Sequence, residues 1–179
     1  MLVAPAGMDT RPTSDRLRET LFNILAPRIE GARVADLYAG SGAIGLEALS
    51  RGAVAVEFVE KAPPALKVLR ANLTALGIRS GATVQAQAAK QWLKRPPAKA
   101  FDIVFLDPPY DAAEEYEAIL GGLGLAAAEF LAADALVIAE HRRKDKLAES
   151  YGLLERSRLR EQGDAALSFY RIRESAQKE

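Results

Sequence analysis

Short apolar runs typical of buried strands alternate with helical stretches along most of the chain, and this alternation restricts the fold more than any other feature. Strands are predicted at residues 33–38, 54–59, 83–87, 101–106 and 135–139. Helices are predicted at residues 13–25, 43–51, 63–76 and 116–125, with a short one around Trp92, and Pro27 is expected to end the first. This order predicts a mostly parallel sheet with helices on both faces, which binds ligands at the carboxyl ends of its strands.

The end of the chain has a different pattern. Two extended runs, 153–160 and 167–173, are separated by Gly163 and Asp164, which predicts an antiparallel hairpin on the sheet edge. The chain has 179 residues and contains no repeat, low-complexity tract or linker. We therefore expect a single domain over residues 1–179, with residues 1–30 as an N-terminal helical segment.

Composition excludes several classes of protein. There is no cysteine and only one histidine, which excludes disulfide scaffolds, zinc ribbons, thiol nucleophiles and iron–sulfur sites, and no metal is expected. The 24 basic residues balance 24 acidic ones, so any binding of nucleic acid must come from a local patch. We see no signal peptide and no apolar run of about 18 residues, and we expect a cytoplasmic monomer without membrane contact.

A glycine-rich turn joins the first predicted strand to the helix that follows. Residues 40–45, Gly-Ser-Gly-Ala-Ile-Gly, fit the pattern G-x-G-x-x-G. Gly40 and Gly42 let the backbone approach a ligand, and Gly45 lets the helix pack close to the sheet. Glu60, twenty residues after Gly40 at the end of the second strand, can accept hydrogen bonds from both hydroxyls of a ribose. The alternative is a tight turn beside a solvated acid.

Asp36 indicates which nucleoside cofactor this turn binds. A carboxylate just before the turn would repel the pyrophosphate of a dinucleotide such as NAD. S-adenosylmethionine has no phosphate and carries two cationic groups, an ammonium and a sulfonium, which Asp36 can attract. Tyr38 also stands where a dinucleotide fold favours a glycine. We therefore expect S-adenosylmethionine, with a strand-end or helix-capping acid as the alternative role for Asp36.

The segment Asp107-Pro108-Pro109-Tyr110 follows the strongest predicted strand. The two prolines end the strand and stiffen the turn. The Asp107 carboxylate and the Pro108 carbonyl can accept both protons of an exocyclic base amine, which directs the nitrogen lone pair toward a methyl group. Tyr110 can stack on the base. The segment therefore predicts amine methylation by alignment rather than by a strong base, with a structural proline turn as the alternative.

With both motifs in place, the sequence resembles the bacterial guanine-N2 methyltransferases of small-subunit (16S) ribosomal RNA. The resemblance is carried by residues 11–23, 36–52, 107–110, 140–141 and 163–170. It implies the Rossmann-like class I methyltransferase fold, with seven strands and an antiparallel last strand. It implies S-adenosylmethionine as cofactor and small-subunit rRNA, or the assembled small ribosomal subunit, as partner. The block 107–110 is shared by all amino-methylating enzymes, including adenine-N6 DNA methyltransferases.

The resemblance also implies site residues. Asp107, Pro108, Pro109 and Tyr110 would surround the guanine. The cofactor would lie among Asp36, Tyr38, Gly40, Ser41, Gly42, Glu60, Lys61, Gln87 and Ala88. The chain departs from the family in two places. It starts almost at the block at Arg11, without the usual basic, strand-forming segment before it. Methyltransferases also often carry Asp or Asn after the third strand, where Gln87 or a backbone group would have to serve here.

Two groups of arginines are candidates for RNA contact. Arg11, Arg16 and Arg18 precede or lie on the first helix, where the alternative is a solvated face with Glu19 as partner. A second group, in the hairpin, alternates along one strand, so its members are expected to share one face of that strand. It comprises Arg156, Arg158 and Arg160, and Arg171 and Arg173 could extend it. The alternative for this group is protection of the edge strand against aggregation.

The leading hypothesis has three rivals. An adenine-N6 DNA methyltransferase would need a target-recognition domain for which the chain has no spare length. A dehydrogenase conflicts with Asp36 and the proline turn. A cofactor-binding protein that docks on the ribosome without turnover conflicts with Asp107 and Tyr110. Outside the motifs, we expect Phe22 and Trp92 to pack in the core and His141 to be an ordinary hydrogen-bonded histidine.

Overall fold

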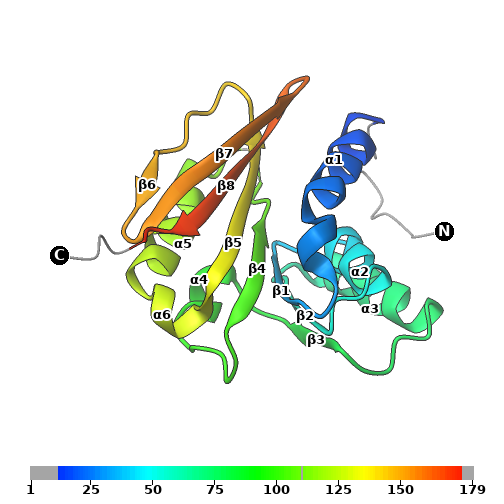
Figure 1. The fold of residues 1–179 in the computed structure, drawn as a ribbon. Coiled ribbons are helices and arrows are strands. Elements are labelled where there is room, and N and C mark those ends of the chain that lie inside the picture. Colours follow the sequence, from blue (N-terminus) through cyan, green and yellow to red (C-terminus); the bar gives the residue numbers. More distant parts are fainter. Residues whose placement is uncertain (1–11, 110, 175–179) are drawn as a thin grey trace.

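The computed structural model describes residues 12–109 and 111–174, which form one sheet of eight strands covered by helices (Figure 1). The strand order is β3-β2-β1-β4-β5-β8-β7-β6. The strands are β1 (Arg33–Leu37), β2 (Ala55–Val59), β3 (Ala82–Gln85), β4 (Phe101–Leu106), β5 (Leu131–Arg142), β6 (Ser150–Tyr151), β7 (Leu154–Gln162) and β8 (Ala165–Ile172). The helices are α1 (Pro12–Ile29), α2 (Ala43–Ser50), α3 (Pro63–Ala75), α4 (Ala89–Trp92), α5 (Ala113–Leu125) and α6 (Ala127–Phe130).

The first five strands are parallel, while β8 and β7 run antiparallel beside β5. The predicted architecture is therefore confirmed, but the count of seven strands is wrong. The extra strand is β6. The chain turns at Gly152, where φ is 57°, so that Ser150 and Tyr151 of β6 pair with Glu155 and Leu154 of β7. A strand of two residues has no alternating pattern, so the sequence could not predict it.

Each face of the sheet has its own hydrophobic core. The α1 face, covered by α1, α2 and α3, buries Phe22, Phe58 and Phe169 among other residues. The α5 face, covered by α4, α5 and α6, buries Trp92 and Phe130. Burial of each such side chain stabilises the fold by about 1.5–3 kcal/mol. Phe22 and Trp92 thus pack in the core as predicted.

Helix α1 continues past Pro27, contrary to the prediction, and ends at Ile29. A proline removes one intrahelical hydrogen bond, but here Ile29 gains burial in the core of the α1 face. The neighbouring Arg28 is also held, because its guanidinium donates to the carbonyl and the carboxylate of Asp134. Tertiary contacts therefore outweigh the local preference of Pro27 to end the helix. Among the described residues, no helix is both long and apolar enough to cross a membrane.

Candidate active site

The carboxyl ends of four neighbouring strands bring the predicted site residues to one edge of the sheet. Leu37, the last residue of β1, pairs with Val59 of β2 on one side and with Leu106 of β4 on the other. Leu106 pairs in turn with Ala139 of β5. The residues that follow these four positions therefore lie side by side at this edge. They are Tyr38, Glu60, Asp107 and Glu140.

Asp36 lies one residue before the end of β1 and is only 1% exposed. Its Oδ2 accepts a hydrogen bond of 2.9 Å from the backbone N–H of Gly45, in the first turn of α2. Burial raises the pKa of Asp36 to about 8, and the nearby carboxylates of Asp107 and Glu60 add to this effect, while the Gly45 hydrogen bond opposes it. A cationic ligand beside Asp36 would therefore strongly favour its ionised form.

The glycine-rich turn has the conformation that its residues suggest. Gly42, directly before α2, has φ of 85°, in the left-handed region that favours glycine. A Cβ atom on Gly45 would lie 2.3 Å from Cε1 of Phe58, so glycine is required there for α2 to pack on the sheet. The buried Asn72 of α3 donates from Nδ2 to the carbonyl of Ser41 at 3.0 Å and holds the turn in place. The sequence analysis missed Asn72, because nothing in a helical pattern marks a residue that contacts a distant loop.

Glu60 connects the glycine-rich turn to the start of α3. Its Oε2 accepts from the N–H of Gly40 at 2.9 Å and its Oε1 from the N–H of Ala62 at 2.8 Å. A carboxylate oxygen can accept a second hydrogen bond, so Glu60 remains able to bind ribose hydroxyls. That role stays a prediction. The neighbouring Lys61 is exposed.

Tyr38, at the start of the glycine-rich turn, contacts α5 directly and α4 through Glu115. It has φ of 61°, a left-handed conformation that costs a non-glycine residue on the order of 1 kcal/mol. Its hydroxyl donates to Oε2 of Glu115 in α5 at 2.5 Å, and Nζ of Lys90 in α4 lies 2.6 Å from Oε1 of Glu115. Burial works to raise the pKa of Glu115, but its hydrogen bonds from Lys90 and Tyr38 and the charges of Lys90 and Lys61 lower it. Glu115 was not predicted, because only packing brings these elements together.

The expected adenine contact after β3 is less well defined. Gln87 is half-buried, and its side-chain amide lies 3.5 Å from Oε1 of Gln85. Ala88 is half-buried at the start of α4. The role of both residues beside an adenine therefore stays a prediction.

Asp107 and Glu140 form the acidic end of the site. Asp107 as a whole residue is exposed, but burial of its carboxyl group raises the pKa of that group to about 7. Glu140 is half-buried, and burial together with the Asp107 charge raises its pKa to about 8. Pro108 is buried beside them, and Pro109 is exposed. Tyr110 lies outside the described residues, as does Arg11.

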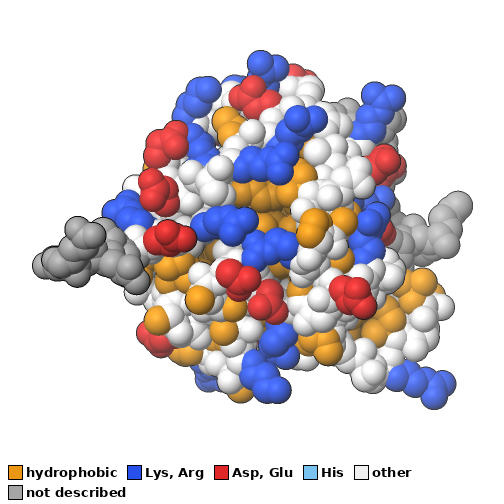
Figure 2. Space-filling model, viewed as in Figure 1, with side chains coloured by type: hydrophobic (Ala, Val, Ile, Leu, Met, Phe, Trp, Pro, Cys, Tyr) orange, Lys and Arg blue, Asp and Glu red, His pale blue; other side chains and the backbone are white. Residues whose placement is uncertain are grey.

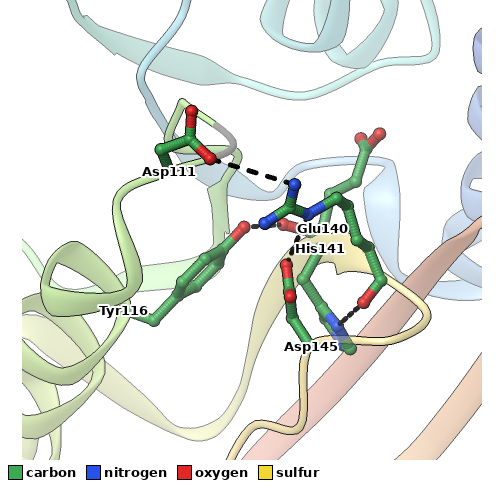
Figure 3. A network of polar contacts seen from close by, with 6 residues as sticks. Asp111, Tyr116, Glu140, His141 and Asp145 are labelled. Carbon is green, nitrogen blue, oxygen red and sulfur yellow. Dashed lines mark hydrogen bonds and ion pairs between the residues drawn. The ribbon is translucent and has the colours of Figure 1, made fainter.

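A polar network holds the last residues of β5 and the turn that follows them (Figure 3). The Tyr116 hydroxyl donates to the carbonyl of Glu140 at 2.7 Å. Nε of Arg142 donates to Asp145 at 2.8 Å, and the same guanidinium lies 3.9 Å from Asp111, just past the proline turn. This network holds the Glu140 backbone in a fixed position.

His141 is an ordinary hydrogen-bonded histidine, as predicted. Its Nε2 lies 2.9 Å from the hydroxyl of Ser168, and its Nδ1 lies 2.9 Å from the carbonyl of Arg142. Burial lowers its pKa. Among the described residues there is no group of acidic residues and histidine that could hold a metal ion.

The predicted arginine stripe on the hairpin is wrong, because β7 has a bulge between Arg156 and Arg158. Arg158 pairs with Phe169 and Arg160 with Leu167, and both partners belong to the core of the α1 face. Arg156 pairs with Tyr170, which belongs to the core of the α5 face. Directly paired residues share a face, so the extra residue of the bulge separates Arg156 from the other two arginines.

The arginines on the two faces of the hairpin also differ in their partners. On the α5 face, Arg156 pairs with Glu149, and Arg143 lies 3.3 Å from Glu161. On the α1 face, Arg158 and Arg160 are exposed and form no ion pair with a described residue. Figure 2 shows basic side chains across the face that contains β7 and β8, with hydrophobic side chains between them.

The arginines of α1 lie beside this surface. Thr20 donates to Oε1 of Gln162 at the end of β7, and Arg16, one turn earlier on α1, is exposed. Arg18 pairs with Asp15 at 3.1 Å, rather than with the expected Glu19.

Comparisons with known proteins agree with this architecture. The family model described as conserved hypothetical protein 95 matches residues 1–171. "Putative rRNA methyltransferase YlbH" of Bacillus subtilis is 35% identical over 174 residues, which is 96% of this chain and 93% of the relative. "Ribosomal RNA small subunit methyltransferase D" of Haemophilus influenzae is 46% identical over 102 residues, and this match spans 56% of the chain and 53% of the relative.

A solved structure shows the same fold at nearly full length. "Putative methyltransferase yhhF" from Escherichia coli superimposes with a TM-score of 0.83 and 34% sequence identity, covering 97% of this chain and 92% of the other. The strand ends with their acids, the glycine-rich turn and the proline turn thus occur on a methyltransferase fold. The chain belongs to the family described as conserved hypothetical protein 95, whose curated relatives are named as methyltransferases of ribosomal RNA.

Proposed function

We propose that the protein transfers a methyl group from S-adenosylmethionine to the exocyclic N2 amine of a guanine in small-subunit ribosomal RNA. The observation that carries this proposal is the set of acids at one sheet edge, beside a rigid Asp107-Pro108 turn. A sheet edge at which several carboxyl groups lie close together favours a cation and repels phosphate. S-adenosylmethionine, the cofactor that the sequence predicts, meets both conditions, because it carries two cationic groups and no phosphate.

The cofactor side of the site fits a nucleoside without phosphate. Gly40 leaves room at the turn, because no atom lies within 4 Å of the place where a Cβ would stand, whereas the same place at Gly42 is taken up by the side chain of Leu69. Glu60 would accept the ribose hydroxyls, and Asp36 would face the cationic groups. When bound, S-adenosylmethionine supplies an electrophilic methyl carbon and leaves as S-adenosylhomocysteine. The role of the protein is then to hold the acceptor amine in line with that carbon.

The target side rests on the proline turn. The Asp107 carboxylate and the Pro108 carbonyl accept the two amine hydrogens and orient the lone pair of the nitrogen. As the nitrogen bonds to the methyl carbon, the amine gives up one proton, and the carboxylate of Asp107, whose pKa is raised, is placed to receive it. Tyr110 would stack on the base, which contributes about 1–3 kcal/mol.

The RNA itself would lie on the α1 face of the hairpin. Arg158 and Arg160 have no acidic partner among the described residues and are free to contact phosphate, and Arg16 lies next to them on α1. Arg156 is excluded from this surface by the bulge. The end of β5 connects the site to this basic surface, because Glu140 and Arg160 both pair with Leu167, so a guanine turned out of the RNA could reach the site edge.

Transfer of tritiated methyl groups tests the proposal. We expect label in small ribosomal subunits that lack the modification, in the N2-methylguanine fraction after digestion, and none in DNA. Label in DNA as N6-methyladenine would contradict the proposal, and absence of label from every substrate would favour a non-catalytic protein. The Asp107→Asn variant should lose most turnover, whereas the matched Asp164→Asn variant, at the exposed hairpin turn, should keep it.

A further inference from the structure

Glu140 is an acid of the site that the predicted mechanism does not use. It directly follows Ala139, which pairs with Leu106, so Glu140 and Asp107 are neighbours on adjacent strands. Two positions earlier on each strand, Ile138 and Phe105 both lie in the core of the α1 face. Because side chains alternate along a strand, Asp107 and Glu140 leave the sheet on that same side.

The backbone of Glu140 is held in place, but its carboxyl group has no hydrogen-bond donor among the described residues. Figure 3 shows it pointing away from Tyr116, His141 and Asp145, while the Tyr116 hydroxyl holds its backbone carbonyl. No described residue donates a hydrogen bond to this carboxyl group or forms an ion pair with it. Burial without hydrogen-bond donors raises the free energy of the ionised Glu140 carboxylate, and the negative charge of Asp107 raises it further. The position therefore suits a ligand that presents hydrogen-bond donors.

Guanine presents two neighbouring donors on one edge, N1–H and the N2 amine, whereas adenine presents an acceptor at N1 beside its amine. We infer that Glu140 accepts the N1–H of the target guanine while Asp107 accepts a hydrogen of N2, so that Glu140 selects guanine. This inference rests on the proposed function and adds the residue that distinguishes the bases. A site that offers an acceptor to an N–H discriminates strongly against a base that lacks it.

The proton on Glu140 makes the selection depend on pH. Ionised Glu140 repels an acceptor at N1, but protonated Glu140 can donate to it. Because the pKa of Glu140 is raised to about 8, selection for guanine should strengthen as pH rises through 7 and 8. The charged or titratable groups around this position are Asp107, Asp36 and Glu60 along the sheet edge, and Arg160 on the same face, which pairs with Leu167 as Glu140 does. The side chain of Arg142 is directed to Asp145 and Asp111.

The experiment uses 2-aminopurine, which keeps the 2-amine but has an acceptor at N1. Small-subunit particles are assembled with rRNA that carries either guanine or 2-aminopurine at the target position, and kcat/KM is measured for each. Wild-type protein should prefer guanine by about 10- to 100-fold. In Glu140→Gln, the amide can accept from N1–H or donate to N1, so the preference should fall toward one.

The control is Glu129→Gln, a matched change at an exposed position of α6, which should keep the wild-type preference. If Glu140→Gln methylates guanine with an unchanged preference, the inference is wrong and the proposed function stands. If wild-type protein does not methylate guanine N2, the proposed function itself fails. The pH profile of the wild-type preference needs no variant, and a flat profile from pH 6 to 9 would also overturn the inference.

Discussion

At the scale of single residues, Asp36 illustrates how a buried carboxyl group can discriminate between ligands. Asp36→Asn keeps an oxygen that can accept from Gly45 but removes the charge. We expect its affinity for S-adenosylmethionine to fall about 10- to 100-fold, while its affinity for S-adenosylhomocysteine, which lacks the sulfonium, falls less. Titration calorimetry with both ligands measures the two changes. Equal losses for both ligands would mean that Asp36 does not interact with the sulfonium.

Gly45 carries a second prediction at this scale. In Gly45→Ala, the new methyl group would lie 2.3 Å from Cε1 of Phe58 and 2.7 Å from Cγ1 of Val56, both buried. Such overpacking should lower the free energy of unfolding by about 1–3 kcal/mol, measured by urea denaturation. The control is Gly121→Ala in α5, where no atom lies within 4 Å and the change should stabilise by about 0.5–1 kcal/mol. Equal effects of the two changes would contradict the packing argument.

At the scale of elements, the bulge in β7 places Arg158 and Arg160 on a different face of the sheet from Arg156. The double change Arg158→Gln and Arg160→Gln should weaken binding of small-subunit rRNA. It should also lower the slope of log affinity against log salt by about 1.4–1.8, because two phosphate contacts are lost. The matched double change on the other face, Arg143→Gln and Arg156→Gln, should leave this slope unchanged. A larger effect of that control pair would place the RNA on the α5 face.

The same bulge shows what sequence reasoning can and cannot predict. The strand β4 was predicted to the residue, because its apolar run ends at a proline turn. The helix α6 was missed, because four residues carry no periodicity, and the bulge was missed because alternation alone cannot show an extra residue. Glu60 and Asp107, which follow strands, were predicted as site acids from their position, whereas Glu140, which lies within β5, was not. Asn72 and Glu115 were not, because their partners are set by packing between distant elements.

At the scale of the whole molecule, the acids of the site couple stability to pH. Asp36 and Glu140 have pKa values raised to about 8 in the folded protein, so below that pH the folded state binds more protons than the unfolded chain. Stability without cofactor must therefore fall as pH rises toward 8. His141 acts in the opposite direction, because its lowered pKa reduces stability as pH falls below 6.5.

Among the described residues, Asp36, Glu140 and Asp107 are the acids with pKa values raised into the interval from pH 6.5 to 8.5. There we expect the Tm of the cofactor-free protein to decrease, and the decrease to be smaller in Asp36→Asn, as scanning calorimetry can measure. A Tm that rises or stays level in wild-type protein would contradict the placement of buried acids at the sheet edge. Since a bound cation favours the ionised carboxyl groups, saturating S-adenosylmethionine should reduce the decrease, and its affinity should rise over the same interval. Asp36, whose burial lowers the stability of the cofactor-free protein at neutral pH, is thus also the group that would face the cationic groups of the cofactor.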